Sequence, residues 1–289
     1  MANLKEIRQR IASVQTTRQV TSAMKMVSAA KLRKAQDAVI KIRPFANKLT
    51  EILSNLSESL KESGDFVFAK SNGEGDKALI IAINSNRGLC GAFNANVNKQ
   101  VAQVLADCKA EGFVNVDVLA IGKSAFDYGR RCHWNVTEKN DLYSALDFAH
   151  SSPILEQIMD DFSAGRYDKV VMVYNVFKNA STQVVTIEQL LPIVMSDTPS
   201  ATTANYIFEP SQEELVEKIL PMSLKMQFYK ALLNSFAAEH AARMTAMHKA
   251  TDNATELLRT LNLQYNKARQ AAITNEITEI VGGADALKE

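Results

Sequence analysis

The feature that most constrains this chain is a long C-terminal stretch with no helix-breaking residue. Ala237 to Val281 contains neither proline nor glycine and is rich in Ala, Leu, Met, Glu, Arg, Lys and Gln, which lose little free energy on entering a helix. Ser211 and Glu214 match a capping box, and Gly282-Gly283 indicates a stop. The pattern predicts a helix over 211–283. At about 1.5 Å per residue it would be about 100 Å long, too long to pack inside its own chain.

Small and apolar residues recur along this stretch in alternating steps of four and three. Such heptad spacing predicts a left-handed coiled coil. The seam residues are His240, Met244, Met247, Thr251, Ala254, Leu258, Leu261, Tyr265, Ala268 and Ala272. Many of them are small, so they permit close approach but each buries little apolar area. Two interpretations are open: a plain coiled-coil arm, or a slender rod that fits inside something else.

The N-terminal segment predicts a second long helix. Asn3 with Glu6 three residues later is a cap with a reciprocal acceptor, and apolar residues follow at steps of three and four. Arg18 and Thr21 interrupt the apolar line, and Pro44 should bend the helix or end a turn there. Each terminal helix is too long for the domain between them. We therefore expect the two to pair antiparallel as a stalk.

Between these helices the pattern changes to strands alternating with helices. The expected strands are 78–83, 114–121, 134–137, 169–177 and 183–191, and the expected helices are 92–110, a short one from 123, and 142–164. This alternation predicts a Rossmann-like α/β domain of mostly parallel strands. The expected fold class is thus α/β plus a long antiparallel coiled coil. The expected divisions are 1–61 (helix), 62–76 (linker), 77–192 (α/β domain), 193–210 (return loop) and 211–289 (helix).

Charge divides the chain into a basic start and an acidic middle. The formal net charge is only +1 over 289 residues, so there is no bulk electrostatic argument for nucleic-acid binding. Residues 1–61 nevertheless carry twelve Lys or Arg against four Asp or Glu, whereas 62–211 carry twelve against eighteen. The basic side chains of the first helix form either a solvated face or a surface for acidic partners.

Cysteine usage and hydropathy bear on the compartment. Cys90, Cys108 and Cys132 are odd in number and form no CxxC pair, which argues against a disulfide framework and fits a reducing compartment. No run approaches the roughly 18 apolar residues that a membrane span needs. The N-terminus lacks the apolar region of a signal peptide. Membrane association is therefore expected only through partners.

The sequence contains no convincing catalytic site. The loop 85–91 follows a strand and precedes a helix, where phosphates often bind. It has neither GxGxxG nor GxxxxGKS, so no nucleotide site is expected. Cys90 has no histidine near it in sequence, and His240 and His248 lack a third metal ligand. No catalytic residue, cofactor or metal is expected. The pattern indicates a moving or bridging part.

Three segments carry a family resemblance. They are IRQRIASVQTTRQVTSAMKMVSAAKLRKAQ, SNRGLCGAFN, and AARMTAMHKATDNA with the later YNKARQAAITNEITEIVGGA. Together they resemble the gamma subunit of F-type ATP synthases over essentially the whole chain. The resemblance implies a central rotor shaft, with the terminal helices as an asymmetric coiled coil inside a hexamer of alternating alpha and beta subunits. The α/β domain would form a foot on the membrane c-ring, together with the epsilon subunit.

The resemblance also implies which residues make contacts. Arg243 and Gln270 would hydrogen-bond to loops of beta, and Arg87 and Cys90 would face an acidic segment at its base. The residues implied to meet the hexamer are Met24, Arg87, Cys90, Arg243, Arg269, Gln270, Thr274 and Glu276. Those implied at the foot, toward the ring and epsilon, are Tyr206, Phe208 and Glu209. Arg243 is expected to matter most, because a guanidinium can bind a carboxylate through two hydrogen bonds.

Departures from the family pattern are modest. Asn86 stands where an acidic residue is usual, and Lys25 places a cation beside Met24. The dithiol insertion of chloroplast relatives is absent, so redox gating is not expected. The family motif begins within a few residues of Met1, which favours a bacterial protein at the cytoplasmic face of the plasma membrane, attached peripherally.

Two hypotheses from other classes remain open. An enzyme with a coiled-coil arm, such as a synthetase that presents RNA, would bind a nucleotide tightly in its middle domain. A static scaffold would tolerate complete cross-linking of Arg243→Cys to a beta subunit with unchanged ATP turnover, whereas a rotating shaft would not.

Overall fold

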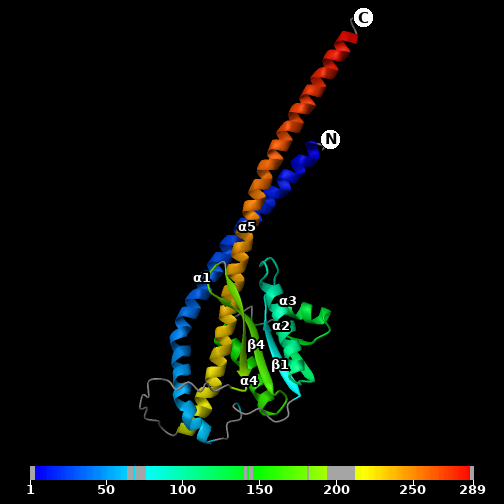
Figure 1. The fold of residues 1–289 in the computed structure, drawn as a ribbon. Coiled ribbons are helices and arrows are strands. Elements are labelled where there is room, and N and C mark those ends of the chain that lie inside the picture. Colours follow the sequence, from blue (N-terminus) through cyan, green and yellow to red (C-terminus); the bar gives the residue numbers. More distant parts are fainter. Residues whose placement is uncertain are drawn as a thin grey trace. The chain divides into compact units, whose positions relative to one another are not determined.

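The structure is a computed structural model that describes residues 4–63, 68, 76–139, 142, 146–180, 182–193 and 212–286. It divides into two units. The helix-pair unit joins residues 1–28 with 244–289, and the sheet unit comprises 29–243. Helices α1 (Leu4–Ser63) and α5 (Gln212–Ala286) contribute to both units (Figure 1). Within the described residues, no helix combines the length and apolarity needed to cross a membrane.

The sheet unit is built on a five-stranded mixed sheet. In the order β3-β2-β1-β4-β5, the first four strands run parallel and the last antiparallel to its neighbour. The strands are β1 (Lys77–Ile83), β2 (Asn115–Ile121), β3 (Asn135–Glu138), β4 (Lys169–Phe177) and β5 (Gln183–Leu191). The helices between them are α2 (Phe93–Ala110), α3 (Lys123–Arg131) and α4 (Phe148–Ser163). The expected fold class of α/β with long terminal helices is confirmed.

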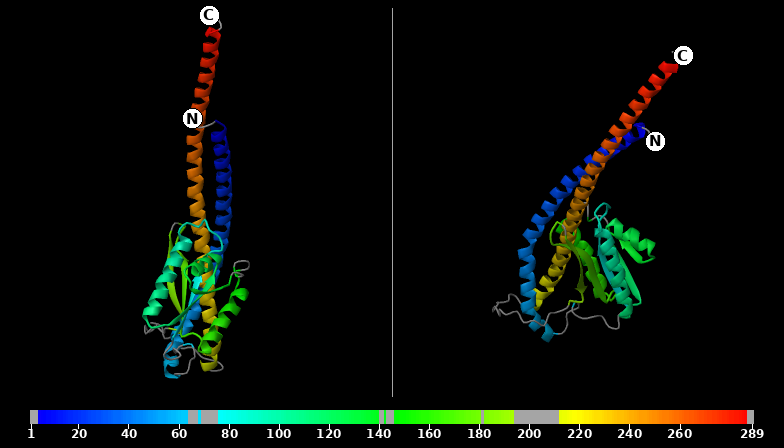
Figure 2. Two further views of the ribbon diagram at one scale, coloured as in Figure 1. Left: turned by 90° about the vertical axis from the view of Figure 1, so that its right-hand side faces the viewer. Right: turned by 45° about the horizontal axis from the view of Figure 1, so that its top comes forward.

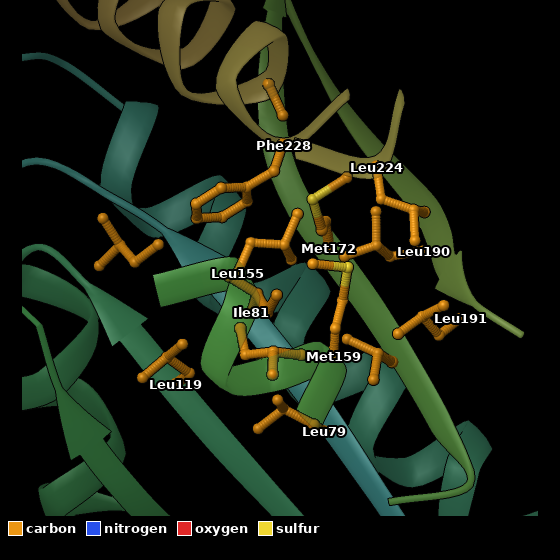
Figure 3. Packing of buried hydrophobic residues seen from close by; sticks show 14 of the residues in the cluster. Leu79, Ile81, Leu119, Leu155, Met159, Met172, Leu190, Leu191, Leu224 and Phe228 are labelled. Carbon is orange, nitrogen blue, oxygen red and sulfur yellow. The ribbon is translucent and has the colours of Figure 1, made fainter. Parts of the chain in front are cut away.

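Both faces of the sheet are covered, because successive side chains of a strand point to opposite faces. Along β1, Ala78, Ile80 and Ala82 pack in a cluster with residues of α2 and α3. Leu79 and Ile81 pack in a second cluster on the other face, with residues of α4 and α5 (Figure 3). The members from these two helices are Leu155, Ile158, Met159, Phe162, Leu220, Leu224, Phe228, Ala231 and Leu232. A strand covered on both faces is apolar throughout, as KALIIAI is after its first residue.

The helix-pair unit is an antiparallel pair. Arg8 donates a hydrogen bond to the Tyr265 hydroxyl over 3.3 Å, whereas Lys25 Nζ lies 3.3 Å from His248 Nδ1, so residue numbers rise along α1 as they fall along α5 (Figure 2). The buried seam residues of this unit are Ile7, Thr21, Ser28, Met247, Ala254, Leu258 and Leu261. The heptad pattern is therefore confirmed here as far as its Ala268 position, which is half-buried like Tyr265.

A polar pair explains the interruption at Thr21. Its Oγ1 lies 2.9 Å from Thr251 Oγ1 across the seam, and it donates to the Arg18 carbonyl. The hydroxyl thus enters the seam with its hydrogen-bonding capacity used. Ala272, in contrast, is exposed, since α1 begins at Leu4 and offers it no partner among the described residues.

Pro44 lies inside α1, which runs on to Ser63. Two expected boundaries are wrong. The C-terminal helix does not stop at Gly282-Gly283, since α5 ends at Ala286, and glycine costs a helix only about 1 kcal/mol. The helix expected from 142 begins instead at Phe148, after the Asp147 side chain accepts a hydrogen bond from the backbone N–H of His150.

A pair of glycines tests the packing of the sheet unit. Gly122 and Gly165 both have positive φ (110° and 72°), but a Cβ on Gly122 would lie 2.2 Å from the Asn84 carbonyl oxygen, while one on Gly165 would meet nothing within 4 Å. Gly165→Ala should lower the free energy of unfolding by about 1–2 kcal/mol. Gly122→Ala should lower it by roughly twice as much, because the backbone must also shift. Urea titration of both variants measures the difference, and equal losses would contradict this account.

Candidate functional site

The loop 85–91 between β1 and α2 is held by its own polar side chains. Ser85 Oγ donates to the Arg87 carbonyl over 2.7 Å, and Ser85 N donates to Asn94 Oδ1 over 3.1 Å. Asn94 Nδ2 in turn donates to Cys90 Sγ over 3.3 Å. Because these bonds join the two ends of the loop to the first turn of α2, the loop has a fixed conformation.

Arg243 of α5 adds a second brace. Its side chain is only 9% exposed, and its Nη1 pairs with Glu239 Oε1 at 2.5 Å. Its Nη2 donates to the Arg87 carbonyl over 3.1 Å and approaches the Gly88 carbonyl at 3.4 Å. One guanidinium therefore connects α5 to the loop. In this structure the residue expected to reach a partner's loop is directed into its own chain.

The helix beneath the loop carries two further buried titratable groups. Burial raises the pKa of Glu239, against the attraction of Arg243. Burial and the positive charges of Arg243 and Lys31 lower the pKa of His240 to about 4. Neither ring nitrogen of His240 has a hydrogen-bond partner among the described residues. Its ring packs edge-on against Phe236, with the two ring centroids 4.4 Å apart. His240 is therefore neutral at pH 7.

Two side chains of the braced loop are exposed to solvent. Arg87 is exposed, and Leu89 is 65% exposed with φ of 63°. A left-handed conformation is costly for leucine and persists only where the surroundings impose it. Cys90, expected to face a partner, is instead buried with Phe93, Ala238 and Ala242. Sequence reasoning missed Leu89, because nothing in the letters SNRGLCG indicates which side chain points outward.

The other expected contact residues lie in the helix-pair unit. Met24 is half-buried, and its carbonyl accepts a hydrogen bond from Ser28 Oγ over 2.7 Å. Four further residues are exposed along α5, beyond the Tyr265 contact with α1: Arg269, Gln270, Thr274 and Glu276. Large apolar side chains are exposed beside them, namely Ile273, Ile277, Ile280 and Val281. Tyr206, Phe208 and Glu209 lie outside the described residues.

In the described part of the chain, no three His, Cys, Asp or Glu residues gather in a way that could hold a metal ion. The three cysteines are free, with Cys90 and Cys108 buried and Cys132 exposed.

The brace predicts a change in thiol reactivity. Lysine at position 243 keeps the charge beside Glu239 but cannot reproduce the fork of guanidinium donors. In a Cys132→Ser background, Arg243→Lys should speed labelling of Cys90 by a thiol reagent about tenfold, since losing a charged hydrogen bond costs roughly 1.5 kcal/mol or more. Cys108, which is also buried, is the reference thiol whose labelling rate should not change. Arg166→Lys, at an ion pair with Asp161 elsewhere in the unit, should leave the rate unchanged.

The low pKa of His240 predicts a stability change with pH. The folded state binds this proton more weakly than the unfolded state, whose pKa is 6.5, so stability is full above pH 6.5 and is lost as pH falls toward 4. His240→Leu removes this loss. The difference in free energy of unfolding between this variant and the wild type should therefore favour the variant by about 2 kcal/mol more at pH 5 than at pH 7. Urea midpoints of both proteins at each pH measure this, and parallel pH curves would contradict it.

Comparisons with known proteins agree along the whole chain. The family model described as ATP synthase matches residues 3–287. The ATP synthase gamma chain of Flavobacterium psychrophilum is 55% identical over all of both chains, and that of Geotalea uraniireducens is 43% identical over all of both. A chain of the Tetrahymena thermophila mitochondrial ATP synthase central stalk and c-ring structure is 25% identical, with TM-score 0.58, over 80% of this chain and 99% of that one.

A more distant likeness supports the fold alone. A chain of the Euglena gracilis mitochondrial ATP synthase is 21% identical, with TM-score 0.72, over 98% of this chain and 94% of that one. The family assignment rests on the sequence relatives, because they match from end to end at 43–55% identity. This chain belongs to the ATP synthase gamma chain family.

Proposed function

We propose that this chain is the central rotor shaft of an F-type ATP synthase, coupling ion flow through a membrane ring to ATP synthesis and hydrolysis in an alpha/beta hexamer. The observation that carries the proposal is the helix-pair unit. Its two helices are paired as far as Ile7 and Ala268, and α5 then continues with exposed polar and apolar side chains from 269 to 281. A helix so exposed requires a surrounding partner. The family relationship and the central-stalk neighbour support the hexamer as that partner.

The mechanism follows from the asymmetry of the pair. A ligand can shift a conformational equilibrium only by interacting differently with its states, and the same applies to a shaft. Beyond the start of α1, α5 continues without it. Opposite sides of the shaft therefore present different side chains. Each orientation therefore favours a different conformation of the beta subunit that it faces. Rotation would then release ATP from sites in other chains, with no catalytic site in this one.

The contact residues are assigned by their exposure. Exposed side chains of α5 would bind loops of beta, through Arg269, Gln270, Thr274 and Glu276. Arg87 would meet an acidic segment of beta, beside Leu89 on the braced loop. Cys90 and Arg243 would act indirectly, by holding that loop in its conformation. Met24 would influence coupling through the packing of the helix pair.

The remaining partners are assigned by family. The sheet unit would contribute to a foot that binds the epsilon subunit and the c-ring, with Tyr206, Phe208 and Glu209 among its contacts. The complex would lie at the cytoplasmic face of a bacterial plasma membrane, and the chain would be a peripheral member. No nucleic-acid partner and no cofactor are proposed.

Direct observation of rotation tests the proposal. The full chain is co-expressed with the alpha and beta subunits of its own organism, the hexamer is fixed to a surface, and a probe is attached to the exposed thiol of Cys132. ATP should drive continuous rotation of the probe in one direction. A complex that hydrolyses ATP while the probe stays still would support a static scaffold instead. Failure to assemble would refute the family-based partners.

A further inference from the structure

A groove in the helix-pair unit has a lining that the proposed contacts do not use. It has a volume of about 560 Å³ and runs between the two helices on one side of their seam. From α1 it is lined by Ile11, Gln15 and Arg18; from α5 it is lined by Thr255, Leu258, Arg259, Asn262, Leu263 and Asn266. These positions recur at steps of three and four, so each helix contributes one face.

The charge of this lining is one-sided. Arg18 and Arg259 line the groove from opposite helices, and no carboxylate is among the lining residues. Within the described chain, neither guanidinium has an ion pair or hydrogen bond. Elsewhere in the same unit, in contrast, Arg10 pairs with Glu6, and His248 with Asp252. Two unpaired cations beside one groove repel each other, and an anion between them would relieve that repulsion.

The other lining groups narrow the chemistry of the occupant. Gln15, Asn262 and Asn266 supply amide N–H donors, and a guanidinium fork matches the two oxygens of a carboxylate. Leu263, which is 65% exposed, and Ile11 add apolar surface. A lone inorganic ion would leave that surface uncovered. Single-stranded nucleic acid would favour aromatic stacking platforms, which the lining lacks. A peptide segment that carries an acidic residue beside an apolar one would match both the donors and the apolar surface of the lining.

We propose that this groove is a docking site for an acidic, partly apolar segment of a neighbouring protein chain, whose carboxylate Arg18 and Arg259 hold together. The inference rests on the proposed function, because the chains that would surround the helix pair are the alpha and beta subunits. It adds a contact separate from Arg269 and Gln270, on the part of α5 that is still paired with α1.

Zero-length cross-linking tests the site in the assembled complex. Full-length Arg18→Lys and Arg259→Lys variants keep the charge and supply an amine. A water-soluble carbodiimide then joins that amine to a carboxylate in direct contact, forming an amide while the reagent takes up water as a urea. Mass spectrometry should identify an Asp or Glu of alpha or beta linked to the introduced amine. Arg259→Gln, which has no amine, is the matched negative control.

A second measurement asks whether one carboxylate serves both arginines. Arg18→Gln and Arg259→Gln should each speed release of the chain from the hexamer in salt by about tenfold, and the double variant by less than the product of the two. Lys267→Gln, at an exposed position outside the groove, should have little effect. Circular dichroism of each variant verifies that the helices are intact.

Three outcomes would overturn the docking site. The first is an assembled complex in which the introduced amines link only to this chain's own acids, such as Glu256, or to nothing. The second is a double variant whose release from the hexamer is faster by the full product of the two single effects. The third is millimolar inorganic phosphate raising the Tm of the isolated wild-type chain but not of the double variant, which would indicate a free-anion site. A chain that fails to assemble would instead refute the proposed function.

Discussion

The burial of α5 is the constraint on which the rest of this structure depends. In the sheet unit its apolar face, including Leu224 and Phe228, is buried against the sheet, where each such side chain contributes about 1.5–3 kcal/mol. In the helix-pair unit the same helix buries a narrower seam, including Ala254 and Leu258, against α1. A wide apolar face fixes the helix firmly, whereas a seam of small residues leaves a slender pair with most of its surface exposed. One helix thus meets both the needs of a stable domain and those of a thin shaft.

Arg243 shows how a functional residue can act without touching a partner. Its guanidinium is almost fully used by Glu239 and two loop carbonyls, so substitution would alter the loop first and any partner second. The unpaired Arg18 and Arg259 are the opposite case, since they have no internal use among the described residues. Burial and pairing therefore separate two kinds of arginine that look alike in a sequence.

Much of the fold could be predicted because it depends on periodicity. The strands 169–177 and 183–191 agree with β4 and β5, since their apolar and β-branched runs are bounded by polar turns. The end of α5 and the start of α4 could not, because neighbouring turns of helix and a single cap decide them. For the candidate site, the family resemblance marked the loop 85–91 and residues of α5 as contacts, and these contacts stay predictions. The burial of Cys90 and the exposure of Leu89 could not, since both depend on contacts with residues distant in sequence.

The sequence by itself determined the helix-rich ends, the heptad spacing, the strand–helix alternation and the family, because each is encoded in local order along the chain. Only the tertiary structure decided that Arg243 points inward, that His240 is neutral, and that Arg18 and Arg259 line one groove. The physical reason is that hydrogen bonding, desolvation and charge pairing depend on distances between atoms. Residues separated by more than 150 positions in the sequence meet here across a few ångströms.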